Sequence, residues 1–415
     1  MILKNIITKN IYPISIYTRT IAGSLILFVI AHYLSVYDYG LFSSYKAIAG
    51  FCFIFANMGF CEYILVSSKA NLKEVKLKIS LFMLNALFIL LFSILVSQFF
   101  NIESHLLFVL VLFCTFFDSV FFALILPFFQ ASNKLQTISK INIIYGLGIT
   151  IIAIVSYIFK LSLVKFLILN ITLGFINFIQ CSYFAKINYF LVFKYIKRFF
   201  LKLDKTIFSY IGVHFANIIT SKLTSLFVSI ILIKEQAALY FAAFTIANFI
   251  TLLNTAQFQK ILPEFINNSA SNIRKLIKHN LNFILLVTGV MLAFFLIFGK
   301  LLLKLLYGQD YYLNAYPILI LFIIANIFTA VGEVYGVYIT SSNNEKYKVL
   351  IRFQAGLITL VSLALLRKFG IYGATISFLL TSICLAILHI NKSLQLLKQQ
   401  EQQENIKENL WNSKN

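Results

Sequence analysis

Long, nearly uncharged apolar stretches recur along the whole chain and restrict it to very few folds. Residues 21–31, 81–96 and 121–129 show the pattern, and 60% of the 415 residues are hydrophobic against 12% that are charged. A water-soluble domain is about 45–50% apolar and about 25% charged, so it could not cover this many Phe, Ile and Leu side chains. An apolar stretch of about 20 residues crosses a lipid bilayer as a helix. The sequence therefore predicts an all-α polytopic membrane protein.

Other structural classes conflict with the residue pattern. The runs are apolar on every face, whereas the strands of a transmembrane β-barrel alternate between apolar and polar residues. The five Cys lie inside apolar runs without a CxxC spacing, so neither a disulfide framework nor a metal site is predicted. No small-residue cleavage site follows the first run, which we interpret as a retained span rather than a signal peptide. Only the polar C-terminal tail has the composition of a disordered segment.

The apolar stretches are separated by short polar segments, and their lengths suit membrane spans. We expect about twelve spans, at residues 13–34, 40–66, 78–99, 105–130, 138–158, 163–185, 206–233, 238–262, 280–303, 315–340, 348–366 and 370–391. The resulting organisation is an N-terminal six-helix lobe at 1–190, a basic linker at 191–205, a C-terminal six-helix lobe at 206–392 and a polar cytoplasmic tail at 393–415.

Lys and Arg residues are distributed unequally between the two ends of these spans. With alternating spans, 26 of the 35 lie on the side of the N-terminus and 8 on the other, while Lys222 falls in mid-span. Cytoplasmic loops of membrane proteins carry the excess of Lys and Arg, so both termini are predicted to be cytoplasmic. The excess of Lys and Arg in cytoplasmic loops thus explains the net charge of +21. A nucleic-acid partner is not needed to explain this charge, and we expect none.

The two halves of the sequence resemble each other. Residues 38–51 align with 236–249, and residues 130–148 align with 340–358, at offsets of 198 and 210 positions. Six spans per half would bring both halves into the bilayer in the same orientation. Parallel repeats related by an axis along the membrane normal are typical of transporters that rock around a central site. The repeat therefore predicts two six-helix bundles related by a pseudo-two-fold axis.

Three segments resemble a known family. They are YDYGLFSSYKAIAGFCFIFANMGF at 37–60, LLLKLLYGQDYYLNAYPILILF at 301–322 and KFGIYGATISFLLTSICLAIL at 368–388. They are similar to the polysaccharide transporters of the multidrug/oligosaccharidyl-lipid/polysaccharide exporter superfamily, over roughly residues 10–390. The resemblance implies a Wzx-type flippase in the bacterial inner membrane. Such a protein moves undecaprenyl-diphosphate-linked oligosaccharide from the cytoplasmic to the periplasmic leaflet, in O-antigen or other surface polysaccharide biosynthesis. A polysaccharide polymerase and a chain-length regulator are the protein partners it implies. Lys222 stands where the family often has an acidic residue, and this departure leaves open whether that position has a role in cation coupling.

Charged residues within the spans are candidate functional groups, because a charge at the bilayer centre costs at least about 2.5–3.5 kcal/mol. Cations lining a wet cavity would attract a lipid diphosphate, and Arg offers phosphate a two-donor fork. The candidate substrate-binding residues are the cations Arg19, Lys46, Lys222 and Arg352 and the amides Asn217 and Asn248. The cations can instead reach the membrane interface or form structural ion pairs, and these alternatives stay open.

Two carboxylates near the middle of the fourth and tenth stretches, Asp118 and Glu333, are the candidate ion-coupling residues. A carboxyl group removed from water binds a proton more readily, and coupling to protons, to sodium ions or to a substrate gradient is open. The other interpretation is an ion pair between helices. Glu333 also belongs to a polar stripe at helical spacing, with Asn326, Thr329, Gly336 and Thr340, which suits either sugar binding or helix packing. No cofactor or metal is predicted.

Two other functions stay open at this point. A multidrug or small-molecule cation antiporter of the same superfamily would favour acidic cavity residues, whereas cations outnumber carboxylates within these spans. A membrane polysaccharide polymerase would need a larger periplasmic loop than any in this chain. The GxSxG, HExxH and GxxxxGK[ST] signatures are also missing from the sequence. We therefore expect a transporter rather than an enzyme.

Overall fold

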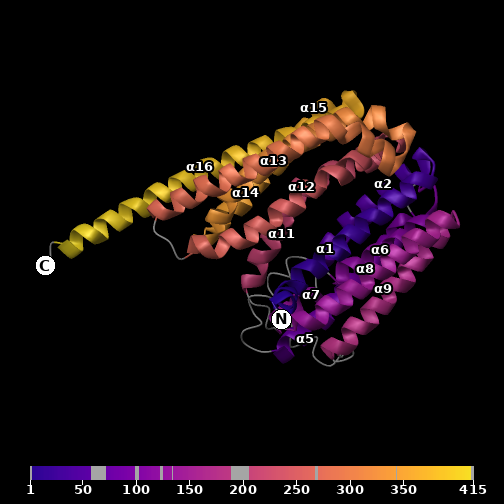
Figure 1. Cartoon of the computed structure of the whole chain (residues 1–415), viewed down its shortest axis with the longest axis horizontal. Helices are drawn as coiled ribbons and strands as arrows, with labels where there is room; N and C mark the ends of the chain where they lie inside the picture. The colour runs from indigo at the N-terminus through magenta and orange to yellow at the C-terminus, as the bar shows by residue number, and fades with distance from the viewer. Residues whose placement is uncertain are drawn as a thin grey trace. The chain divides into compact units, whose positions relative to one another are not determined.

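The described parts of the chain are built from α-helices. The computed structural model describes residues 2–57, 72–98, 102–121, 125–132, 134–187, 205–266, 270–342 and 344–412, and within these ranges it contains no β-strand (Figure 1). The chain divides into two compact units, Met1–Phe215 and Ala216–Asn415. The division falls within a helix just beyond the predicted linker. The lobe boundaries at 190 and 206 themselves stay predictions.

The first unit is assembled from helices of very different lengths. They are α1 (Ile2–Tyr33), α2 (Val36–Cys52), α3 (Ile54–Asn57), α5 (Leu72–Ser97), α6 (His105–Val120), α7 (Leu126–Ala131), α8 (Leu135–Ile158) and α9 (Leu163–Ala185). Helix α1 packs along α8, and α6 contacts both α2 and α9. Ser35 and Ser104 begin α2 and α6, because each side chain accepts a hydrogen bond from a backbone N–H of the first turn.

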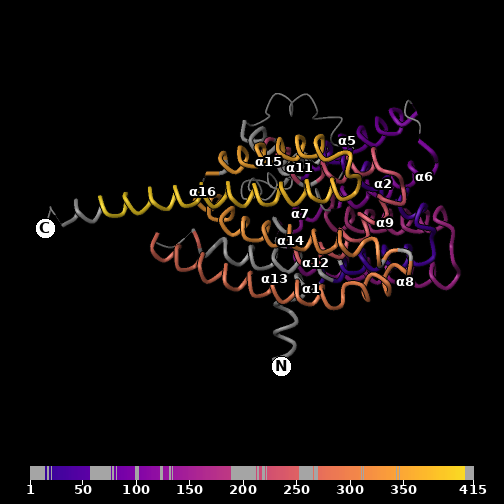
Figure 2. The backbone as a smooth tube through the Cα atoms, turned by 90° about the horizontal axis from the view of Figure 1, so that it is seen from above, coloured from indigo at the N-terminus to yellow at the C-terminus, as the bar shows by residue number. Residues whose placement is uncertain are grey.

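The second unit is arranged around one central helix. It contains most of α11 (Lys205–Ile231), then α12 (Lys234–Ile266), α13 (Ala270–Tyr307), α14 (Gln309–Ser341), α15 (Glu345–Leu366), a 3₁₀ turn (Arg367–Phe369) and α16 (Gly370–Asn412). Helix α14 packs against α12, α13 and α16, and it runs between α13 and α16 in Figure 2. Phe322 of α14 lies at the centre, 5.0 Å from the ring of Tyr240 and 5.4 Å from that of Phe378.

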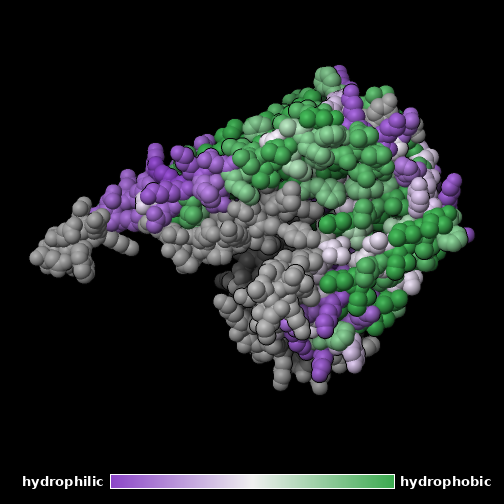
Figure 3. Space-filling view, in the orientation of Figure 1, coloured by the Kyte–Doolittle hydropathy of each residue, from purple (hydrophilic) through white to green (hydrophobic). Residues whose placement is uncertain are grey.

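Where the structure describes them, the twelve predicted spans fall almost entirely on helices. Within the described parts of the chain, six helical stretches are long and apolar enough to cross a membrane: Val36–Ala56, Leu135–Ile158, Leu163–Ala185, Ala270–Tyr307, Leu313–Ser341 and Lys346–Ile406, the last of which joins α15 to α16. Shorter apolar helices occur at Ile21–Tyr33, Phe82–Ser97, His105–Val120 and Lys222–Ile231. Hydrophobic residues cover much of the face visible in Figure 3, while the C-terminal part of α16 is hydrophilic. The number of spans and the position of the termini stay predictions.

The fourth predicted span, residues 105–130, includes residues 122–124, which lie outside the described residues. Helix α6 ends at Val120, and α7 begins at Leu126 with Pro127 as its second residue. Proline is tolerated in the first turn of a helix but disrupts a helix interior. Pro127 therefore lies at a position of α7 that accepts proline.

The C-terminal tail differs from the prediction. Its composition predicts disorder, yet α16 continues as a helix to Asn412. Contacts with the start of α13 account for the order. The Glu404 carboxylate accepts hydrogen bonds from the backbone N–H of Ala270, at 3.1 and 3.3 Å, and Glu401 lies 2.9 Å from Arg274. A carboxylate at a helix N-terminus is favoured by the helix dipole.

A Gly-xxx-Gly spacing on α14 permits close packing against α16. A Cβ atom on Gly332 would lie 2.9 Å from the Cα of Ala386, and one on Gly336 would lie 3.1 Å from the ring of His389. Small residues that let two backbones approach are common where membrane helices pack. Gly332 and Gly336 therefore lie where α14 and α16 approach each other closely.

Substituting Gly332 should therefore loosen the contact between α14 and α16. We expect Gly332→Ala to lower the free energy of unfolding by about 1–3 kcal/mol, because the backbone of α16 must move to admit a methyl group. The matched control is Gly289→Ala on α13, where an added Cβ meets nothing within 4 Å. This control should be neutral or stabilising by up to about 1 kcal/mol, because Ala is the better helix former. Thermal unfolding of the purified proteins in detergent compares the two, and equal stabilities would contradict the packing argument.

Candidate functional site

The predicted intramembrane charges form two clusters, one in each unit. Arg19 and Asp118 belong to the first unit, and Glu333 and Arg352 to the second. Each pair joins an acidic residue on one helix to an arginine on another. Of the two interpretations that the sequence left open for the carboxylates, the structure contains ion pairs.

The first cluster holds a buried guanidinium. Arg19 of α1 is only 4% exposed, and its Nη2 lies 3.6 Å from Oδ1 of Asp118 on α6. Its Nη1 donates to Oδ1 of Asn142 on α8 at 3.3 Å. The Cζ atom lies 3.5 Å from the ring centre of Phe121 and 3.9 Å from that of Tyr145. Arginine stacks on aromatic rings through its planar, weakly hydrated head group. Stacking on two rings therefore stabilises this side chain in addition to its ion pair.

A small cavity adjoins this cluster. Its volume is about 90 Å³, and Lys46, Cys114, Asp118, Tyr145 and Asn170 contribute to its lining. Asp118 is 50% exposed although its arginine partner is buried, and Lys46 is exposed. Apolar side chains such as Ile26, Phe42 and Leu167 make up much of the rest of the lining. The structure thus brings two predicted site residues, Lys46 and Asp118, to one cavity.

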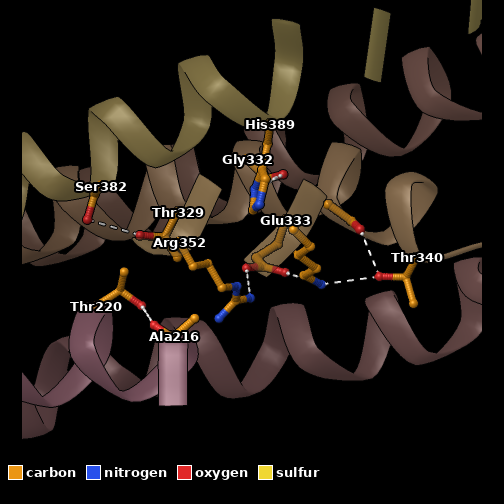
Figure 4. Close-up of polar contacts among 11 residues, drawn as sticks. Ala216, Thr220, Thr329, Gly332, Glu333, Thr340, Arg352, Ser382 and His389 are labelled. Carbon is orange, nitrogen blue, oxygen red and sulfur yellow. Dashed lines mark hydrogen bonds and ion pairs between the residues drawn. The ribbon is translucent and has the colours of Figure 1, made fainter. Parts of the chain in front are cut away.

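The second cluster holds two cations around one carboxylate. Glu333 of α14 accepts a hydrogen bond from Nη2 of Arg352 on α15 at 2.7 Å, and its other oxygen lies 3.6 Å from Nζ of Lys348. Lys348 also donates to Oγ1 of Thr340 at 3.4 Å. The three charged side chains are 15–20% exposed. Figure 4 shows the Glu333 and Arg352 side chains directed toward each other. The formal charge of this cluster is positive by one.

Sequence reasoning missed one member of this region, His389. Its imidazole is fully buried on α16, with Nδ1 3.1 Å from the carbonyl oxygen of Gly332 (Figure 4). Among the described residues, His389 Nε2 and Arg352 Nε are buried and have no hydrogen-bond partner. The signal available in the sequence was an isolated histidine inside the last apolar stretch. The two glycines of α14 supply the space that this ring occupies.

The polar stripe of α14 joins helices. Asn326 donates to the carbonyl oxygen of Ala247 on α12 at 2.9 Å, and Thr329 donates to Ser382 on α16 at 3.1 Å. These contacts correspond to the packing alternative for the stripe, because side-chain hydrogen bonds between helices stabilise membrane bundles. Only the Glu333 end of the stripe carries charge.

The structure describes the side chains of two of the remaining predicted residues. Lys222 is exposed on α11, and Asn248 is half-buried on α12. The side chain of Asn217 lies outside the described residues. Within the described ranges, no group of three or more His, Cys, Asp and Glu side chains is arranged to hold a metal ion.

A basic group occurs at the start of α5, outside the predicted spans. The ammonium group of Lys76 donates to the carbonyl oxygen of Lys186 at 3.1 Å. Partial burial lowers the pKa of Lys76, and the charges of Lys134 and Lys186 lower it further. Cations that repel one another in this way favour the approach of an anion.

Comparisons with known proteins identify the family and the fold. The family described as polysaccharide biosynthesis protein matches residues 29–317. No curated protein sequence matches the chain. A lipid II flippase MurJ in an inward closed conformation is similar, with 15% identity, a TM-score of 0.69, and coverage of 92% of this chain and 87% of that one.

Two further solved structures have the same fold. An inward-facing multidrug resistance MATE family transporter of the MOP superfamily has 12% identity and a TM-score of 0.66, covering 92% of this chain and 96% of that one. A MOP superfamily transporter from Pyrococcus furiosus has 11% identity and a TM-score of 0.58, covering 94% of each chain. None of these three is described as an enzyme. The family match spans well over half of the sequence, so the chain belongs to the polysaccharide biosynthesis protein family and has the fold of MOP superfamily transporters.

Proposed function

We propose that this protein is a flippase for a lipid-linked oligosaccharide. It moves undecaprenyl-diphosphate-linked repeat units from the cytoplasmic to the periplasmic leaflet of a bacterial inner membrane, by alternating access, in O-antigen or other surface polysaccharide biosynthesis. Membership of the polysaccharide biosynthesis family supports the pathway, and the fold shared with MOP superfamily transporters supports the type of activity. A layout of twelve spans with both termini in the cytoplasm, as the distribution of Lys and Arg indicates, is part of this proposal.

The excess of cations around Glu333 is the observation that carries the proposal. One carboxylate faces both Arg352 and Lys348, so cations outnumber carboxylates among these three residues. Coulomb attraction for a phosphate is strong where the surroundings have a low dielectric constant. Arg352 supplies a two-donor fork and Lys348 a point charge, which are the two common ways to hold phosphate oxygens. A diphosphate headgroup fits this charge better than a cationic drug does.

Asp118 is the better candidate for ion coupling of the two carboxylates. Its side chain is 50% exposed beside a cavity, whereas Glu333 is 20% exposed and held by two cations. A coupling ion must enter and leave during each cycle, so access matters as much as charge. Protons and sodium ions are both suitable ions for this site. Lys46, which lines the same cavity, supplies a cation there, and the exposed Lys222 supplies another on α11.

Deleting the gene and extracting the carrier lipids tests the proposal. We expect undecaprenyl-linked oligosaccharide to accumulate in the cytoplasmic leaflet, where added lectin does not reach it in spheroplasts. Expression of the wild-type chain should restore surface exposure. Co-purification of a polysaccharide polymerase or a chain-length regulator would identify the expected protein partners.

Two other outcomes would contradict the flippase proposal. Unchanged carrier pools together with altered drug tolerance would indicate a cation antiporter. Shortened surface polymer with normal lectin access to the repeat units would indicate a polymerase.

A further inference from the structure

A second cavity lies at one end of the second unit, away from the charge clusters. Its volume is about 320 Å³, which is within the range of small-molecule sites, about 300–1,000 Å³. Its walls come from the end of α12, the start of α13, the end of α14 and the C-terminal part of α16. Among the residues that the structure describes, none that lines it is charged. The same end carries Arg274, Lys275, Lys278 and Lys398, which places it on the predicted cytoplasmic side.

The inner wall of this cavity is apolar and aromatic. Phe265 and Tyr338 meet edge to face, with ring centres 6.1 Å apart and planes at 82°. Ile273 and Leu396 extend this wall and are buried. The C–H faces of a sugar ring pack against such surfaces by the same apolar contact that buries any hydrocarbon face.

The outer wall is polar but neutral. Gln399 and Gln403 lie one helical turn apart on α16, so both amides share one face of that helix. Among the described residues neither amide makes a hydrogen bond within the protein, and Asn344 uses only its Nδ2 group, on Ser342. A carboxamide presents a donor and an acceptor together, which suits neighbouring hydroxyl groups of a sugar.

Fixed contacts hold this polar wall in position. Tyr338 donates its hydroxyl hydrogen to Oε1 of Gln400 at 2.9 Å, and Nε2 of Gln400 donates to Glu404 at 3.0 Å. Glu404 in turn accepts from the backbone of Ala270 at the start of α13. A site whose walls are set before binding loses less entropy when the ligand arrives.

Two carboxylates next to the cavity are already engaged. Glu401 is paired with Arg274 at 2.9 Å, and Glu404 is hydrogen-bonded to the first turn of α13. Since the described lining residues include no cation, their chemistry favours an uncharged, hydroxyl-rich ligand over a phosphate.

We propose that this cavity binds neutral sugar units of the oligosaccharide on the cytoplasmic side of the protein. The identity of the ligand rests on the proposed flippase function and deepens it, because it separates recognition of the glycan from recognition of the diphosphate. The glycan is bound between the aromatic wall of Phe265 and Tyr338 and the amides of Gln399 and Gln403. The charge cluster at Glu333 is left to the headgroup.

Binding measurements on the full-length protein in nanodiscs test this site. The probe is the oligosaccharide released by mild acid from the carrier lipid of wild-type membranes, titrated by calorimetry. The double variant Gln399→Ala, Gln403→Ala should weaken its binding at least about tenfold, because two sets of hydrogen bonds are lost. Gln402→Ala is the matched control, since Gln402 is exposed on the same helix and does not line the cavity; its affinity should stay within about twofold of wild type. Inorganic diphosphate, added as a second probe, should not displace the oligosaccharide.

The outcomes separate this inference from the proposed function. Wild-type affinity in the double variant, with unchanged thermal stability, would overturn the sugar site, as would displacement of the oligosaccharide by diphosphate. If the double variant binds the sugar weakly but wild-type protein moves no carrier lipid in proteoliposomes, the sugar site is supported and the flippase proposal is refuted. Since neither glutamine makes a hydrogen bond within the described protein, we expect both variants to fold.

Discussion

Glu333→Gln should remove about 3 kcal/mol from the free energy of unfolding and abolish export of the oligosaccharide. The substitution keeps the shape of the side chain but removes the charge that faces Arg352 at 2.7 Å and Lys348 at 3.6 Å. Breaking a buried ion pair by removing one partner costs about 3–5 kcal/mol, because the remaining charge is left without compensation. We expect the low end of that range, since the amide oxygen still accepts a hydrogen bond from Arg352. Thermal unfolding in detergent and lectin labelling of spheroplasts measure the two effects.

Two further variants show whether the cations left without a compensating carboxylate cause the loss of stability. Glu401→Gln makes the same chemical change in an exposed pair, where Arg274 is 56% exposed, and should cost less than about 1 kcal/mol. Adding Arg352→Gln and Lys348→Gln to Glu333→Gln should recover most of the stability, because a neutral cluster strands no charge. Export should stay absent in that triple variant, since the two cations proposed to bind phosphate are gone. A triple variant less stable than Glu333→Gln would refute this explanation.

Arg19→Lys should destabilise the first unit by about 2 kcal/mol even though the charge is retained. The guanidinium lies 3.5 and 3.9 Å from two aromatic ring centres and is 4% exposed. A desolvated cation–π contact contributes about 2 kcal/mol or more, and a compact ammonium cannot reproduce two-sided planar stacking. The matched control is Arg274→Lys on the surface pair, which should change stability by less than about 0.5 kcal/mol. If both variants unfold at the wild-type temperature, charge alone holds the cluster together and the role of stacking is refuted.

The sequence predicts the helices well because their cause is local. Long apolar runs with few charges favour helices wherever they lie in the chain, and the described parts of the predicted stretches fall almost entirely on helices. The close approach of α14 to α16 is equally readable, since Gly332 and Gly336 are spaced one turn apart. The residues at depth, Arg19, Asp118 and Glu333, are visible in the sequence as isolated charges within apolar runs.

The partners of these charges are not readable from local pattern. Arg19 contacts Asn142, which is 123 positions away, and only the packing of α1 on α8 brings them together. The same holds for the helical tail. Its polar composition predicts disorder, but the contact of Glu404 with Ala270, 134 positions away, orders it. His389 was missed for a related reason, because its significance depends on the two glycines of a different helix.

Helix α16 has a mechanical consequence of its own. It runs without interruption through 43 residues, and at about 1.5 Å per residue this makes a rod of about 64 Å. That length is roughly twice the ~30 Å hydrocarbon thickness of a bilayer. The rod contacts α14 at Ala386 and His389, and it also presents Gln399 and Gln403 to the second cavity. Because the helix is stiff, a tilt at one end also moves the other end. Ligand binding in the second cavity is therefore coupled to the packing of α16 against α14.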